Sequence, residues 1–194
     1  MATPLTRSDL MSLEQYSEQR GEFRSKVIAH KKNRRVGIGP HLFLYFEDRL
    51  TIQYQVQEML RIEKIFESAG IEEELEAYNP LIPDGHNLKA TAMLEYQDVD
   101  ERKAQLALLK GIEGLIWIQV NGFDPVYAIA NEDLERSNEQ KTSAVHFMRF
   151  ELEPEMIAAL RGGAALRMGT NHESYRYSTD VEARICDSLL ADLE

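Results

Sequence analysis

The sequence predicts an α+β fold: one domain over residues 1–194, with several helices packed on a mixed, mostly antiparallel sheet of about seven strands. Short apolar or alternating runs, which are typical of strands, recur along the chain, and segments with apolar residues at helical spacing lie among them. Both hairpins and strand–helix–strand units are indicated, which favours a mixed sheet. No internal repeat or linker divides the 194 residues, a length sufficient for one substantial core.

The N-terminal region, residues 6–33, is predicted to be helical. Ser12 and Gln15 fit a capping box at a helix start, and Gly21 marks a weak point inside the helix. We expect the helix to end in the basic run His30–Arg35, because the helix dipole favours cations at a C-terminus.

Residues 35–178 are predicted to hold the sheet and its helices, and residues 179–193 a C-terminal helix. Turn residues mark boundaries: Gly39-Pro40 bends the first two strands, Pro154 opens a helix and Gly162-Gly163 closes it. The expected strands are two short ones within 34–49, then 88–96, a hairpin within 114–130, 143–152 and 164–170. The expected helices are 51–69 between a Thr51 cap and Gly70, 71–78, 98–110 and the short one after Pro154.

The helix expected over residues 51–69 has two polar residues within its apolar stripe. Gln55 and Glu63 fall among stripe residues on a helical wheel, with Glu63 near the centre of the set Ile52, Val56, Met59, Leu60, Ile62 and Phe66. A carboxylate that faces a core must be paired, hydrogen-bonded, metal-bound or protonated. Two explanations follow: a structural ion pair with an inward arginine such as Arg20 or Arg149, or a chemical site.

A strand face just before this helix supplies the other candidate residues. His41, Tyr45 and Glu47 alternate along one strand and share a face, and His146 lies on an apolar face of another strand. Two histidines and two carboxylates suit zinc, iron or manganese, but their spacing matches no known ligand signature, and a hydrogen-bonded core histidine is the alternative. No metal ligand is therefore assigned. The candidate pocket comprises His41, Tyr45, Glu47, Gln55, Glu63 and His146.

The charge distribution is uneven. The formal net charge is −11, yet residues 1–35 carry eight Lys or Arg against four Asp or Glu. An acidic chain argues against binding to nucleic acid, whereas a local basic surface suits an acidic partner. The candidate docking surface comprises Lys31, Lys32, Arg34 and Arg35, and a solvated helix end is the alternative explanation.

A cytoplasmic location is expected from three features. Cys186 is the single cysteine, so no intrachain disulfide forms, and its place beside Ile185 and Leu189 predicts a buried, inert thiol. The N-terminus lacks a signal pattern, and the longest apolar run, Leu42–Phe46, is too short to cross a membrane. The polar segment Gly169–Tyr175 is expected to be a loop after a strand.

Several long blocks together resemble the bacterial family labelled domain of unknown function 3501, over nearly the whole chain. These blocks are VIAHKKNRRVGIGPHLFLYFEDR, YQVQEMLRIEKIF, EELEAYNPLIPDGHNLKATAMLEY, VYAIANEDLERS and KTSAVHFMRFEL. The resemblance assigns no activity and carries over no catalytic residue. It implies an association with rubrerythrin-like or iron–sulfur oxidoreductase-like proteins. In place of the family pattern Asp-His-Pro-x-Tyr this chain has Asn171-His172-Glu173-Ser174-Tyr175, which weighs against this segment as a site.

Three functional hypotheses follow. The first is a cytoplasmic accessory or binding protein that works with redox or oxidative-stress proteins and docks through its basic N-terminal surface. The second is an enzyme, metal-dependent in one version, in which Glu63 near His41 is a ligand or general base. The third is a small-molecule binding module. The sequence identifies no cofactor.

Overall fold

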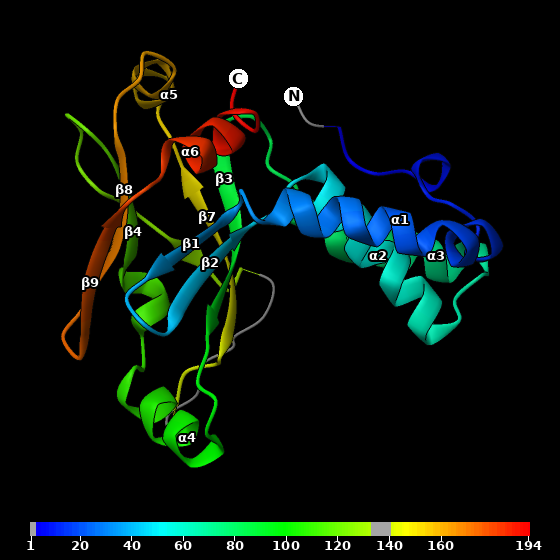
Figure 1. The fold of residues 1–194 in the computed structure, drawn as a ribbon, viewed down its shortest axis with the longest axis horizontal. Coiled ribbons are helices and arrows are strands. Elements are labelled where there is room, and N and C mark those ends of the chain that lie inside the picture. Colours follow the sequence, from blue (N-terminus) through cyan, green and yellow to red (C-terminus); the bar gives the residue numbers. More distant parts are fainter. Residues whose placement is uncertain (1–2, 133–140) are drawn as a thin grey trace.

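The computed structural model describes residues 3–132 and 141–194 and contains two sheets and an arm of helices (Figure 1). The helices of the described chain are α1 (Leu13–Lys31), α2 (Arg49–Glu63), α3 (Ser68–Tyr78), α4 (Val99–Leu108), α5 (Pro154–Arg161) and α6 (Ala183–Leu190). The strands are β1 (Arg35–Ile38), β2 (Leu42–Phe46), β3 (Asn87–Leu94), β4 (Ile116–Val120), β5 (Val126–Tyr127), β6 (Ile129–Ala130), β7 (Val145–Glu151), β8 (Leu166–His172) and β9 (Tyr175–Asp180). Among residues 3–132 and 141–194, no helix is both long and apolar enough to span a membrane.

The strands form two sheets whose neighbouring strands are all antiparallel in the described chain. One sheet has the order β1-β2-β3-β7-β6 and the other β5-β4-β8-β9. The predicted α+β class is confirmed, but the single mixed sheet is replaced by these two. Strand–helix–strand order in the sequence suggested parallel pairs, whereas every pair of neighbouring strands among the described residues is antiparallel.

Residues 169–175, expected as a loop, belong to a hairpin between β8 and β9. His172 pairs with Tyr175 across the two residues Glu173 and Ser174. The strand β9 was not predicted because it is exposed along most of its length and its sequence lacks an alternating apolar pattern. The hairpin places Tyr175 against the first two strands, where the side chain is buried.

Both sheets contribute to one apolar core. Leu44, Phe46 and Phe150 enter it from the five-stranded sheet, and Ile118 and Met168 enter it from the four-stranded sheet. Removing these side chains from water is the main stabilising contribution to this part of the molecule. Three helices close the core with Leu106, Met156, Ile157, Leu160, Ile185 and Leu189.

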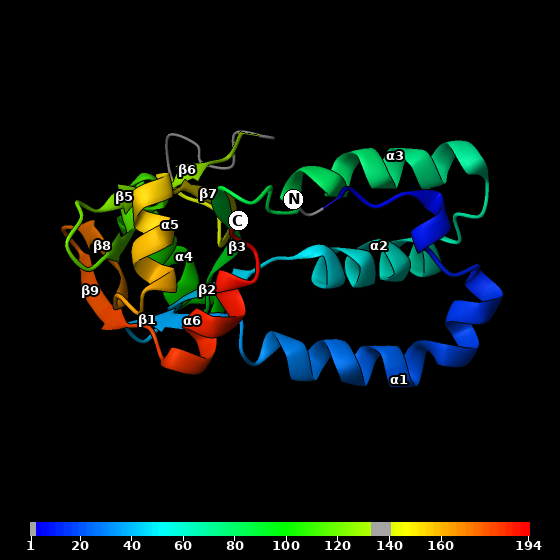
Figure 2. The same cartoon turned by 90° about the horizontal axis from the view of Figure 1, so that it is seen from above.

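Helices α1, α2 and α3 form an arm that extends away from the two sheets (Figures 1 and 2). The chain leaves the arm after α1 to make the hairpin β1–β2, returns for α2 and α3, and then enters β3. The capping box of Ser12 and Gln15 at the start of α1 is confirmed. The arm has a small apolar core of its own, made by Leu5, Ile52, Val56, Leu60, Leu75 and Ile82.

Helix α2 begins and ends earlier than predicted. Asp48 is its N-cap, because its carboxylate accepts a hydrogen bond of 2.9 Å from the amide of Thr51, which lies inside the first turn. Lys64, with a φ of 56°, adopts the left-handed conformation that ends the helix, so Gly70 lies within α3. Since the chain turns before Phe66, this side chain is 69% exposed.

Candidate functional site

A cavity of about 440 Å³ lies where the base of the arm meets the outer face of the five-stranded sheet, the face directed away from the core. This volume is within the range of small-molecule sites. Tyr45, Thr91 and Phe147 form one row across its floor, because they are paired in register on β2, β3 and β7. Met93 and Val145 belong to the neighbouring row. The arm and the turn after it supply the opposite wall: Lys31, Ile52, Gln55, Tyr78 and Leu81.

Glu47 lies in this cavity with its carboxylate held on both oxygens. The Thr51 hydroxyl donates to Oε2 at 2.6 Å, and the Thr91 hydroxyl donates to Oε1 at 2.8 Å. Thr51 comes from the first turn of α2 and Thr91 from β3, so arm and sheet together orient the group. Among the described residues, no Lys, Arg or His nitrogen lies within 4 Å of this carboxylate. The carboxylate is therefore positioned, while its negative charge is left without an ion pair.

The backbone of Glu47 is fixed as firmly as its side chain. Its amide donates to the Lys89 carbonyl at 2.8 Å, and its own carbonyl accepts from Arg34 Nη2 at 3.1 Å. Although Lys89 is the cross-strand neighbour, its ammonium group donates to the Pro80 carbonyl at 2.7 Å instead. Burial lowers the pKa of Lys89, because the ammonium group is partly removed from water. Glu47 and Lys89 are thus adjacent without being paired.

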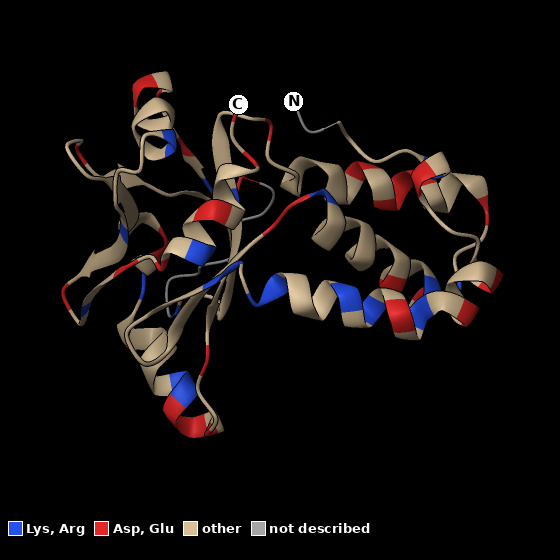
Figure 3. Ribbon diagram, turned by 45° about the horizontal axis from the view of Figure 1, so that its top comes forward, with Lys and Arg blue, Asp and Glu red and all other residues tan. Residues whose placement is uncertain are grey.

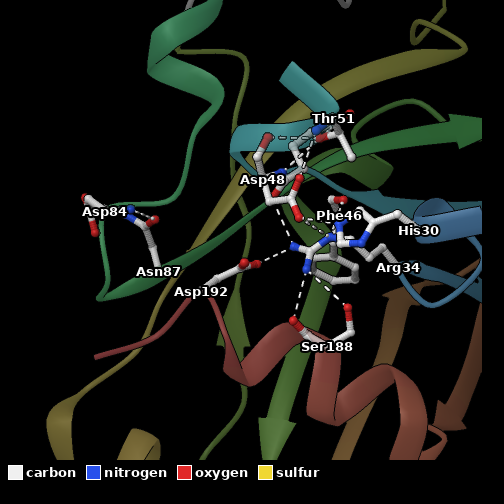
Figure 4. Close-up of polar contacts among 10 residues, drawn as sticks. His30, Arg34, Phe46, Asp48, Thr51, Asp84, Asn87, Ser188 and Asp192 are labelled. Atoms are coloured by element: carbon white, nitrogen blue, oxygen red, sulfur yellow. Dashed lines mark hydrogen bonds and ion pairs between the residues drawn. The ribbon is translucent and has the colours of Figure 1, made fainter. Parts of the chain in front are cut away.

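Arg34 is the centre of a polar cluster that joins the arm to the sheets and to α6 (Figure 4). Its side chain is only 2% exposed. Nε donates to the Phe46 carbonyl at 3.1 Å and Nη1 to the Ser188 carbonyl at 3.0 Å, while Nη2 pairs with Asp192. The planar guanidinium has enough donors to satisfy all of these acceptors together.

Two carboxylates share this arginine. Asp48 Oδ2 lies 3.5 Å from Arg34 Nε and 2.5 Å from His30 Nε2 (Figure 4). Burial opposes ionisation of Asp48, but Arg34, the Thr51 amide and His30 together lower its pKa. Burial raises the pKa of Asp192 to about 6 against the opposing effect of Arg34. The cluster therefore fixes the Phe46–Asp48 segment, and with it the backbone of Glu47.

Of the six predicted pocket residues, Tyr45, Glu47 and Gln55 line this cavity. His41 does not line this cavity. It lies in a neighbouring groove that shares Met93 and Val145 with the cavity, and its ring is stacked on Tyr96 at 4.1 Å between centroids. His146 is buried on the opposite, core-facing side of the same sheet. Its Nε2 lies 2.9 Å from the hydroxyl of Thr142, so it is the hydrogen-bonded core histidine of the alternative explanation.

The prediction that Glu63 faces a core is wrong. Glu63 is the exposed last residue of α2, about 12 Å further along the helix than Gln55. On the helical wheel Glu63 points in the direction of the buried Ile52 and Val56, but it is the last residue before the chain turns at Lys64, and its side chain is exposed. The buried polar residues of α2 are Thr51, in its first turn, and Gln57, whose side chain accepts from the Met11 amide at 2.6 Å.

The arginines proposed as partners of Glu63 have other acceptors. Arg20 binds both oxygens of Glu58, at 2.7 and 2.9 Å, and this contact lowers the pKa of Glu58 to about 2. Arg149 binds Glu132 and Glu151. Within residues 3–132 and 141–194, no three His, Cys, Asp or Glu side chains are placed to hold one metal ion. The hypothetical set of His41, His146, Glu47 and Glu63 is not assembled.

The predicted docking surface is divided among different environments. Lys32 is exposed, whereas Lys31 lines the cavity and Arg34 is buried in the polar cluster. Arg35 lies 3.8 Å over the ring of Phe43 and donates to the Tyr45 hydroxyl. Figure 3 shows basic residues along α1 interspersed with acidic ones, and acidic residues along α3. Consecutive positions in the sequence therefore do not make one basic surface.

The residues that position Glu47 were not predicted from the sequence. Thr51 was expected only as a helix cap, and Thr91 and Arg34 were not considered as supports. One signal was present: Thr51 follows Glu47 by four residues across a helix start, and Thr91 shares its alternation with Lys89 and Met93. Their convergence depended on the register between β2 and β3, which the sequence does not state.

Comparisons with known proteins agree on the fold and carry no activity. The model of the family described as protein of unknown function (DUF3501) matches residues 4–193. The chain is also similar to a solved structure, a novel protein of unknown function from Burkholderia pseudomallei K96243. The two share 51% sequence identity and a TM-score of 0.94, over 99% of this chain and 100% of that one. No curated protein matches the chain.

Proposed function

The chain belongs to the DUF3501 family, and we propose that it binds a small organic molecule which presents a positively charged amine to Glu47. The observation that carries this proposal is the Glu47 carboxylate itself. Two threonine hydroxyls orient it inside a cavity of about 440 Å³, and no cation of the described residues neutralises it. A ligand amine would complete the charge pair.

The surroundings of Glu47 favour such a ligand. A charge-assisted hydrogen bond to a carboxylate is about twice as strong as a neutral one, and it strengthens when the ligand excludes water. Tyr45, Tyr78 and Phe147 offer aromatic surface to the body of the molecule, and aromatic faces also attract cations. A mostly apolar wall with a few fixed polar groups is the usual character of a small-molecule site.

The proposal is tested by thermal denaturation in the presence of small amines. Isopentylamine, phenethylamine and tyramine are compared with the matching alcohols, which lack the charge. Amines that bind the folded chain raise its Tm, and the alcohols raise it less. In Glu47→Gln the affinity is expected to fall by about tenfold or more, since a hydrogen bond to a charged group contributes about 1.5–3 kcal/mol.

Glu63→Gln is the matched control, because it removes the same charge from an exposed position at the far end of α2, the helix that follows Glu47. It is expected to respond to amines as the unmodified chain does. Equal responses of Glu47→Gln and Glu63→Gln, or the absence of any amine-dependent rise in Tm, would contradict the proposal. Far-ultraviolet circular dichroism establishes that each variant is folded.

The predicted partnership with rubrerythrin-like or iron–sulfur oxidoreductase-like proteins stays a prediction from the family resemblance. Ligand binding neither requires it nor opposes it. A metal-dependent enzyme built on His41 and Glu63 is not proposed, because Glu63 is exposed at the end of α2 and His41 lies in a groove that Glu63 does not line.

A further inference from the structure

We infer that the ligand of this cavity is a small zwitterion, an amino acid with an apolar side chain, whose carboxylate pairs with Lys31 while its ammonium group pairs with Glu47. The inference rests on the proposed function and names the class of ligand. Its starting point is the ammonium group of Lys31, a second charged group in the same cavity, for which an amine ligand offers no partner.

Lys31 is the last residue of α1, and its half-buried side chain lines the cavity. Across the part of the chain that the structure describes, no Asp or Glu oxygen lies within 4 Å of its ammonium group. Lys31 and Glu47 therefore line one small cavity with opposite charges, more than 4 Å apart, and neither has an ion-pair partner among residues 3–132 and 141–194. A molecule that carries both charges can satisfy both side chains at once.

Neutral polar groups and apolar walls complete the match. The side chains of Gln55 and Tyr78 line the cavity and make no hydrogen bond with another described residue, so both can bind the ligand's polar end. Ile52, Met93 and Phe147 leave an apolar surface for a side chain. A purely cationic or purely anionic ligand would leave one of the two charged residues buried beneath it without a partner, which is costly.

Calorimetric titration of matched pairs tests this inference. The full chain is titrated with leucine and isopentylamine, phenylalanine and phenethylamine, and tyrosine and tyramine, where each amine is the amino acid without its carboxylate. 3-Phenylpropionate serves as the anion alone. At least one amino acid is expected to bind about tenfold or more tightly than its amine, the effect of one added charge-assisted contact.

Two lysine variants give the second part of the test. Lys31→Gln is expected to abolish the preference for the amino acid and leave the affinity for the amine within about twofold, because the amine pairs with Glu47 alone. Lys32→Gln removes the charge of the exposed neighbour and is expected to keep the preference.

The outcomes separate the two proposals. If amines bind in a Glu47-dependent manner but amino acids bind no more tightly, or if Lys31→Gln keeps the preference, the zwitterion inference is overturned while the proposed function stands. If neither amines nor amino acids bind, both are overturned. Tighter binding of 3-phenylpropionate than of phenylalanine would also overturn the inference.

Discussion

At the scale of the residue, the segment Phe46–Asp48 performs three tasks in three consecutive positions. The Phe46 side chain enters the core, the Glu47 side chain enters the cavity, and the Asp48 side chain caps α2 and contacts Arg34. Arg34 binds the carbonyl groups of both Phe46 and Glu47. A buried arginine with neutral and acidic acceptors thus sets the position of a carboxylate that it does not itself neutralise.

Asp192 is expected to make stability depend on pH. Its folded-state pKa of about 6 exceeds the ordinary value of 3.8, so between these values the folded chain holds a proton that the unfolded chain releases. The free energy of unfolding therefore falls as the pH rises from about 4 to 6, by at most about 3 kcal/mol. In Asp192→Asn this contribution is absent. Urea denaturation at pH 4, 5, 6 and 7 measures the difference in slope.

Asp180→Asn is the control for this measurement, because the Asp180 side chain is 79% exposed. For Asp180→Asn, the plot of the free energy of unfolding against pH is expected to be parallel to that of the unmodified chain. Groups with a lowered pKa, such as Asp48 and Glu58, act with the opposite sign at lower pH, and Asp192→Asn leaves them in place. Parallel curves for Asp192→Asn and the unmodified chain would show that Asp192 ionises normally in the folded state.

At the scale of the element, the hairpin β8–β9 shows how one side chain connects the two sheets. The Tyr175 hydroxyl donates to the Ile38 carbonyl at 2.8 Å and accepts from the amides of His41 and Leu42, at 2.8 and 3.0 Å. These three backbone groups lie at the end of β1, in the turn after it and at the start of β2. Gly39 in that turn has a φ of +68°, and a Cβ there would lie 2.6 Å from the ring of Tyr177.

Tyr175→Phe is expected to lower the free energy of unfolding by about 2 kcal/mol or more. The ring stays, but buried backbone donors and an acceptor lose their partner, and each unsatisfied group costs about 1–3 kcal/mol. Tyr177→Phe on the same strand is the control, since that hydroxyl has no hydrogen bond to another described residue and the side chain is 46% exposed. Chemical denaturation that finds equal losses for the two variants would argue against this role of Tyr175.

At the scale of the whole molecule, the arm and the sheets have separate apolar cores, so polar contacts at the base of the arm matter for their relative position. Arg34 contacts Asp48 at the start of α2 and Asp192 after α6, which brings residues at opposite ends of the chain together (Figure 4). The cavity lies at the same junction, with walls from both parts. We therefore expect the affinity for the proposed ligand to depend on how firmly these contacts hold the arm against the sheets.

Arg34→Met is expected to destabilise the chain by about 3–5 kcal/mol, because it leaves two carboxylates without their buried partner. Arg34→Lys is expected to recover little of this lost stability, since a lysine lacks the planar set of donors of the guanidinium group. Arg35→Lys, at the exposed neighbour, is the control and is expected to cost less than about 1 kcal/mol. Hydrogen exchange is expected to show joint loss of protection at the end of α1, the start of α2 and α6 in Arg34→Met. Loss confined to one of these elements would contradict a clamp across the junction.

Local signals in the sequence predicted much of the architecture. The capping box at Ser12, Pro154 at the start of α5 and the alternation along β3 and β7 depend on neighbours within a few residues. Three of the predicted pocket residues do line the cavity, again through local relations in the sequence. Tyr45 and Glu47 share a strand face, and Gln55 follows on the next helix. The prediction for Glu63 was wrong because a helical wheel gives only the direction of a side chain, and Glu63 is the exposed last residue of α2, where the chain turns at Lys64.

The sequence by itself determined the α+β class, the existence of most helices and strands, and the polar strand face that now lines a cavity. Only the tertiary structure decided the division into two antiparallel sheets, the burial of Arg34 and the convergence of Thr51 and Thr91 on Glu47. The physical reason is range: caps and periodicity depend on residues close in the chain. Strand register and a buried arginine that reaches Asp192 depend on contacts between residues far apart in the chain.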